Sequence, residues 1–225
     1  MAHIIIYQMG ESKMLTDWNF WFSIITAIVA IIALFLSLRQ IQLSNKQQLF
    51  ERRLNAYIIT NGLIELYIEN KVFFEQKREN SPQLTINMEF VWLTNNSYMK
   101  QAANAIEHPL EKPYHQEFLT KREQLRTLAK EIELIFNGKE AINYAEFVSC
   151  YERTLVKMYQ YQIVLNNIDK ENEKHPMLTE AFRSSAVERK EREDLYSAMQ
   201  ELQEAYAVLL KEKVDEKIRR QISLK

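Results

Sequence analysis

The chain has 225 residues, with 29 lysine and arginine residues against 30 aspartate and glutamate residues and a formal net charge of -1. This balance gives no support for nucleic-acid binding, which usually needs a clearly basic face, and a single cysteine, Cys150, excludes an intramolecular disulfide. Three glycines and four prolines, among many Glu, Lys, Gln and Leu residues, favour long helices over a turn-rich sheet fold. We predict an all-α protein: one N-terminal transmembrane helix that continues into, or is joined to, a cytosolic helical bundle.

The first element is an apolar run from Trp18 to Leu38 without a charged side chain, bracketed by Asp17 and Arg39. A bilayer core ~30 Å thick needs ~20 apolar helical residues, and this run supplies them. A secretory signal peptide would have a shorter apolar core and a small-x-small cleavage site, whereas this run ends in Ser37-Leu38-Arg39. We predict a transmembrane helix over 17–38. The sequence leaves open whether the tail over 1–16 lies on the membrane surface, pairs as a strand or is disordered.

Basic residues are concentrated on one side of this run. Arg39, Lys46, Arg52 and Arg53 follow it, and Lys13 is the only Lys or Arg before it. Because positively charged flanks stay in the cytoplasm, we expect a single-pass protein of the inner (cytoplasmic) membrane. Residues 1–16 would lie outside and residues from 39 onward in the cytosol.

Small and hydroxylated residues share one side of the run. Thr26, Ala30, Ala33 and Ser37 follow one another at steps of four, three and four, with Ser23 and Ala27 beside them. Small residues let membrane helices approach closely, so this stripe favours helix–helix packing or pore lining in a homo-oligomer. The ordinary abundance of alanine and serine in membrane helices is the alternative. In a ring of copies the same face would line a lumen, and a water-filled pore is a further step that the residues permit.

The segment 39–80 is predicted to be a juxtamembrane helix. Leu43, Phe50, Tyr57 and Ile64 recur every seven residues, with Leu54 and Ile68 between them at helical spacing. A break near Leu43-Ser44-Asn45 competes with one continuous helix, since Ser and Asn prefer caps and turns.

Residues 81–225 are predicted to form the cytosolic helical domain. Pro82 breaks the chain, and 85–107 fits either a strand or a helix, with the helix favoured. A turn over 108–113 precedes three predicted helices, 114–136, 141–165 and 177–220. Asn137-Gly138 separates the first two, and a polar linker over 166–176 separates the last two.

The sequence contains no motif of a phosphate loop, a zincin or a nucleophile elbow. His108 and His115 flank two prolines, but exposed loop histidines are favoured over a metal site. Cys150 is interpreted as a small buried apolar residue. We therefore predict no catalytic, cofactor-binding or metal-binding residues, and no enzyme.

The basic stretch SNKQQLFERRLNAY, from Ser44 to Tyr57, lies between the membrane run and the helical domain. In its order of an N-terminal membrane helix, a basic juxtamembrane stretch and a cytosolic helical domain, the chain resembles small membrane-anchored bacterial phage-defence proteins. It is similar to the pore-forming accessory proteins of type VI-B CRISPR systems, which oligomerise through a membrane helix and carry a HEPN-like helical domain. The resemblance implies control of membrane permeability during infection. HEPN ribonucleases carry an Arg four to six residues before a His, and no histidine of this chain has one, which argues against such an active site.

Three functions compete at this point. The first is a homo-oligomeric membrane effector, with a pore as its furthest form, in bacterial antiphage defence. The second is a non-enzymatic single-pass adaptor that recruits a cytosolic partner protein through the apolar stripe after Arg39. The third is a membrane-tethered hydrolase whose site the sequence does not reveal.

Overall fold

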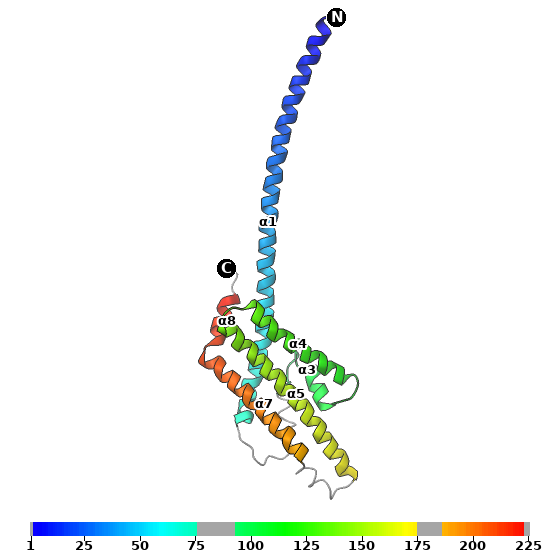
Figure 1. The fold of residues 1–225 in the computed structure, drawn as a ribbon, viewed down its shortest axis with the longest axis vertical. Helices are drawn as coiled ribbons and strands as arrows, with labels where there is room; N and C mark the ends of the chain where they lie inside the picture. The colour runs from blue at the N-terminus through cyan, green and yellow to red at the C-terminus, as the bar shows by residue number, and fades with distance from the viewer. Residues whose placement is uncertain (1, 76–92, 175–185, 223–225) are drawn as a thin grey trace. The chain divides into compact units, whose positions relative to one another are not determined.

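The computed structural model describes residues 2–75, 93–174 and 186–222, and all regular structure in these ranges is helical (Figure 1). The described helices are α1 (Ala2–Glu75), α3 (Lys100–Glu107), α4 (Tyr114–Ile135), α5 (Lys139–Lys174), α7 (Ala186–Lys211) and α8 (Val214–Ile222). The all-α prediction is confirmed. The chain divides into two compact units, residues 1–49 and residues 50–225.

The first unit consists of the N-terminal part of α1. Residues 2–16, left open by the sequence, are helical. The helix also includes Ser44 and Asn45, so the competing break at this position does not occur. No glycine or proline lies between Glu11 and Asn61 to interrupt it. Helix propensity therefore prevails over the capping preference of two polar residues.

The second unit is built around α5, which lies between α4 and α7 (Figure 1). The predicted stripe of this helix is buried: Ala141, Tyr144, Val148, Tyr151, Leu155, Met158 and Leu165. Phe147, Cys150, Tyr159 and Tyr161 are buried as well, so more than one face of α5 is covered. A helix that is apolar on several sides belongs in the middle of a bundle, and this one packs against α3, α4, α7 and α8.

The surrounding helices bury the faces that their periodicity predicts. On α4 these residues are Phe118, Leu125, Leu128, Ile132 and Ile135, and on α7 they are Leu195, Met199, Leu202, Tyr206 and Leu209. The part of α1 after Leu49 contributes Tyr67, whose ring centroid lies 4.8 Å from that of Tyr206 and 6.2 Å from that of Phe147. One apolar core therefore joins α1, α5 and α7 within this unit.

The helix favoured over 85–107 is confirmed only for Lys100–Glu107, because residues 93–99 form turns and residues 85–92 lie outside the described ranges. Asn96 explains the turn: its side-chain Oδ1 accepts a hydrogen bond from the backbone N–H of Met99 at 2.8 Å. Such local bonds from an asparagine compete with the helical hydrogen-bond pattern.

The boundary between α4 and α5 differs in detail from the predicted one. Helix α4 ends at Ile135. The next residue, Phe136, has an extended backbone conformation and a buried side chain. Gly138 follows with a φ of 85°, a conformation in which a Cβ is disfavoured. The glycine therefore serves the turn into α5, and does not itself terminate α4.

Two boundaries near the C-terminus were predicted wrongly. Helix α5 continues to Lys174 through most of the predicted linker 166–176, because no glycine or proline lies between Lys139 and Pro176 and Ile168 is buried. The predicted helix over 177–220 is interrupted after Lys211, where Lys213 has a φ of 49°. The change of direction lets Val214 and Ile218 of α8 reach the core, where both are fully buried. Residues 177–185 of that prediction lie outside the described ranges.

Several core tyrosines predict a loss of stability in alkali. Burial raises the pKa of Tyr144, Tyr151 and Tyr161 above the usual value near 10. In the unfolded chain these phenols ionise near pH 10, whereas in the fold they stay neutral. The free energy of unfolding therefore does not depend on these tyrosines below about pH 10. Above this pH it falls by about 1.4 kcal/mol per pH unit for each tyrosine that stays neutral in the fold.

We expect helical circular dichroism to persist to about pH 10 and then fall together with the appearance of tyrosinate absorbance. The interpretation fails if all eleven tyrosines titrate with an ordinary pKa while the helices remain intact.

Candidate functional site

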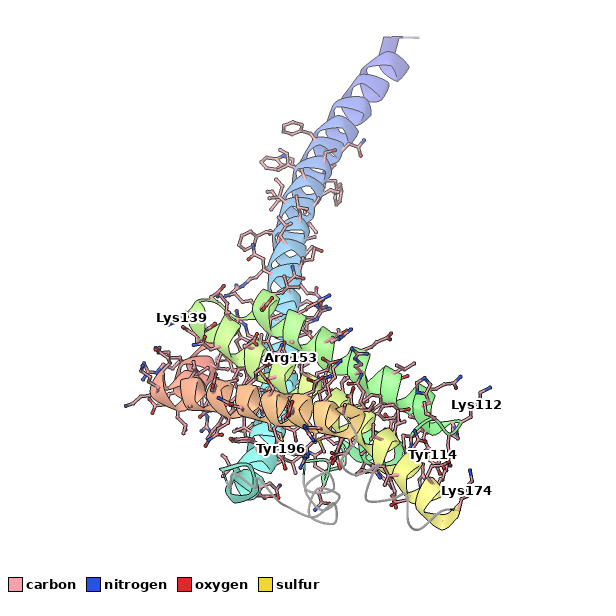
Figure 2. All side chains as sticks on the ribbon, turned by 60° about the horizontal axis from the view of Figure 1, so that its bottom comes forward. Lys112, Tyr114, Lys139, Arg153, Lys174 and Tyr196 are labelled. Carbon is pink, nitrogen blue, oxygen red and sulfur yellow. The ribbon has the colours of Figure 1, made fainter. Side chains whose placement is uncertain are left out.

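The apolar part of α1 carries its large side chains in the open. Apart from the half-buried Ile24, the large apolar side chains between Trp18 and Leu38 are 51–67% exposed within this chain. Figure 2 shows them standing out around α1. This helix is long and apolar enough to cross a membrane near the N-terminus. An uncovered apolar surface of this extent is unfavourable in water.

The small residues predicted as a packing face, Ser23, Thr26, Ala27, Ala30, Ala33 and Ser37, are all exposed on α1. The hydroxyl of Ser23 donates to the carbonyl oxygen of Asn19 at 2.8 Å, and that of Thr26 donates to the carbonyl oxygen of Phe22 at 2.7 Å. Both hydroxyls are thereby satisfied within their own helix. Neither needs water or a neighbouring helix as a hydrogen-bond partner, which leaves the size of these residues as their main contribution to packing.

The spacing of this face extends beyond the residues predicted. Alternating steps of four and three run from Asn19 through Ser23, Thr26, Ala30, Ala33 and Ser37 to Gln40 and Ser44. All eight positions are small or polar, and all lie in α1 of the first unit. The sequence prediction did not include Asn19, which is polar and larger than the other residues of this face within the run, or Gln40 and Ser44, which lie beyond the end of the run. We call these eight residues the α1 seam.

The four predicted juxtamembrane cations have different surroundings. Arg39, Lys46 and Arg52 are exposed, and within the described ranges the structure gives them no ion pair. Arg53 is half-buried in the second unit. Three of the four cations are therefore available to an anionic surface, and Arg53 has a structural role.

Arg53 joins the ends of two helices. Its Nε donates to the carbonyl oxygen of Ile135, the last residue of α4, and its Nη1 donates to the carbonyl oxygen of Gln221 near the end of α8, both at 2.7 Å. The last carbonyls of a helix have no partner within the helix and carry partial negative charge. One guanidinium therefore caps two helix C-termini at once.

Tyr57, one turn further along α1, extends this network. Its hydroxyl donates to Oδ1 of Asp215 at 2.9 Å and accepts a bond from Nε of Arg219 at 2.7 Å. Arg219 also pairs with Asp215 at 3.0 Å. Burial, followed by the bond to Asp215, raises the pKa of Tyr57, so the phenol stays a donor at neutral pH.

The contacts of α1 with α8 form a defined unit. We call Arg53, Tyr57, Asp215, Arg219 and Gln221 the α1–α8 clasp. Gln221 completes it by exchanging two hydrogen bonds with the backbone of Asn137, at 2.8 and 3.0 Å. The sequence indicated none of the pairings that join different elements, since those partners are 82–168 residues apart.

The candidate chemical residues do not converge. His115 lies in the first turn of α4, not in a loop, with Nδ1 2.9 Å from the hydroxyl of Tyr159, whereas His108 stacks on Tyr114. Burial raises the pKa of Cys150 to about 12, so its thiol is protonated at neutral pH. Within the described ranges, no group of three or more His, Cys, Asp or Glu side chains is placed to hold a metal ion.

Comparison with known proteins supplies no relative for this chain. No protein-family model matches it. No curated protein and no solved structure matches it significantly either. The features of this chain that bear on its function are therefore the exposed apolar helix, its seam and the helical second unit.

Proposed function

We propose that the protein is a single-pass membrane protein that assembles into a homo-oligomer through the α1 seam and acts as a membrane effector. The observation that carries the proposal is the seam itself. Eight small or polar residues follow a 3.5-residue repeat on a helix whose other sides are mostly large and apolar between Trp18 and Leu38. Such a repeat places the same side toward a neighbouring helix over its whole length and favours a left-handed helix bundle.

Several copies of the same chain are the simplest occupants of this face. The hydrophobic effect does not drive helix association within lipid, so close packing and interhelical hydrogen bonds must do so. Ala30 and Ala33 allow close approach in the middle of the run, and the carboxamide of Asn19 is placed to bond to its counterpart at one end. The exposed Arg39, Lys46 and Arg52 support an orientation with the second unit in the cytosol, where they would meet anionic lipid headgroups.

We infer the context of antiphage defence and a pore from the resemblance in plan, which covers the whole chain and extends to a motif only over Ser44–Tyr57. The inner membrane is inferred from the basic residues that follow the apolar run. A ring of seams would enclose a narrow, weakly polar lumen, because two of the hydroxyls already bond within their own helix. A pore with such a lumen would stay closed or free of water until the arrangement of the helices in the oligomer changes. Ion flux across liposomes that contain the purified protein distinguishes a pore from a sealed oligomer.

Replacing both Ala30 and Ala33 with leucine is the test of the seam. The added bulk separates the helix backbones, and overpacking of this kind costs about 1–3 kcal/mol per site. We expect light scattering in mild detergent to give one discrete oligomer for the wild type. For the variant we expect dissociation at least about tenfold easier, since about 1.4 kcal/mol corresponds to a factor of ten.

The matched control replaces Ile28 and Ile32 with leucine, which keeps the apolar character and changes the side of α1 away from the seam. It should leave the oligomer unchanged. A monomeric wild type, or equal dissociation of both variants, would remove the basis for the proposal.

A non-enzymatic adaptor is the second candidate, and a specific surface favours it. Leu54, Ile58 and Ile68 are exposed on the part of α1 in the second unit. However, the predicted docking stripe is partly used internally, because Tyr57 and Ile64 pack against the core of this unit. A strictly monomeric protein that retains its membrane attachment would favour the adaptor over the homo-oligomer.

A further inference from the structure

A pocket of about 280 Å³ opens in the second unit where α4, α5 and α7 meet. Arg122 and Arg126 of α4 form one wall, and α5 and α7 supply the others. Figure 2 shows Arg153, a further lining residue, on α5 at this side of the molecule. The pocket shares no residue with the α1 seam or the α1–α8 clasp.

Glu152 holds the two arginines of this wall in place. It is only 5% exposed, and its Oε1 lies 2.5 Å from Nε of Arg122 and 3.2 Å from Nε of Arg126. A single buried carboxylate thus keeps two guanidinium groups side by side, although like charges repel. One positive charge on this wall is left without a counter-charge.

Most donors of these two guanidinium groups are unused. A guanidinium has five N–H donors, and the hydrogen bond of Arg122 within the described ranges uses Nε alone. Arg126 pairs through Nε as well, and its side chain is 55% exposed. The terminal nitrogens of both side chains therefore form two adjacent donor forks, and a guanidinium fork matches the oxygens of a phosphate group.

The opposite side of the pocket carries no surplus positive charge. Lys157 pairs with Asp194 at 2.8 Å, and Arg153 pairs with Glu201 at 3.0 Å and with Glu146, outside the lining, at 2.8 Å. In total four cations and three carboxylates line the pocket, so its surplus positive charge lies on the Arg122–Arg126 wall. An anion would be drawn to that wall, and the carboxylates of the other wall could accept bonds from hydroxyl groups of the same ligand.

We propose that this pocket binds a small phosphate-bearing molecule, with Arg122 and Arg126 holding the phosphate group. Val156 and Ala198 provide apolar surface for the rest of the ligand. The volume is larger than one phosphate group requires and lies just below the range of about 300–1,000 Å³ typical of sites for drug-sized ligands. A nucleoside monophosphate or a sugar phosphate has the matching chemistry. The site would give the helical unit a means to receive a chemical signal.

The test is a calorimetric titration of the full-length protein in neutral detergent. Inorganic phosphate, pyrophosphate and AMP are the soluble probes, and micellar phosphatidic acid is the lipid probe. We expect saturable binding of at least one soluble probe, weakened at least tenfold by Arg126→Gln. That variant leaves Glu152 paired with Arg122, so the fold should persist, as circular dichroism on the same sample will verify.

The matched control is Lys130→Gln, which removes the same charge one turn along α4 at an exposed position outside the pocket. It should change the dissociation constant less than twofold. The proposal is overturned if no soluble probe binds the wild type, if phosphatidic acid alone binds, or if the two variants weaken binding equally. The titration is independent of oligomer size, so its failure and the failure of the seam are separate results.

Discussion

Replacing Ile28 and Ile32 with lysine should release the protein from membranes. Both residues lie near the middle of the uncharged run and are exposed on α1. Exchanging an isoleucine for a lysine at the centre of a spanning helix costs about 3 kcal/mol, and two exchanges cost about 6 kcal/mol. We expect the wild type to float with lipid in a density gradient and to resist alkaline carbonate. The double variant should remain at the bottom of the gradient.

A control with the same added charge isolates the effect of position. Gln42→Lys with Gln48→Lys places two lysines on the exposed part of α1 after the run, where positive charge is compatible with the membrane surface. This variant should float like the wild type. The membrane assignment would be abandoned if the wild type stayed soluble without detergent and without aggregation.

Replacing Arg53 with glutamine should destabilise the second unit, whereas the same change at its neighbour Arg52 should have little effect. Arg53 makes two charge-assisted hydrogen bonds to the carbonyl ends of α4 and α8, and Arg52 is exposed. Hydrogen bonds to charged groups contribute about 1.5–3 kcal/mol each. Because the glutamine amide can replace part of these hydrogen bonds, we expect the free energy of unfolding to fall by about 2–4 kcal/mol.

For a folded unit of this size, that loss corresponds to a fall in Tm of roughly 5–15 °C. Thermal unfolding followed by circular dichroism in one detergent checks it, with Arg52→Gln as the neighbouring control. The Tm of Arg53→Lys should lie between those of Arg52→Gln and Arg53→Gln, because an ammonium group keeps the charge but does not reproduce the guanidinium fork that reaches both carbonyls. Equal Tm values for the Arg52 and Arg53 variants would show that the α1–α8 clasp does not hold the two helix ends.

Periodicity was informative wherever a helix had one apolar face. The buried faces of α4 and α7 and the main stripe of α5 follow directly from steps of three and four. Boundaries were harder, because they depend on contacts that are distant in sequence. The break at Lys213 exists because Val214 and Ile218 are buried, and no local signal announces it.

The functional candidates also differ in how far the sequence predicts them. The α1 seam can be read from the sequence, since it consists of residues on one helix at a fixed spacing. The different roles of Arg52 and Arg53 cannot, because adjacent arginines of equal charge differ only in which helix ends lie nearby. The phosphate pocket is equally hidden. Arg122, Glu152 and Asp194 come from three helices that the chain brings together only on folding.

The sequence by itself determined that the chain is helical and carries one apolar helix able to span a membrane, because helix propensity and hydropathy are properties of contiguous residues. Only the tertiary structure decided which charged side chains pair, cap or stay available. Those outcomes depend on distances between groups that are far apart along the chain, and on how far each group is removed from water.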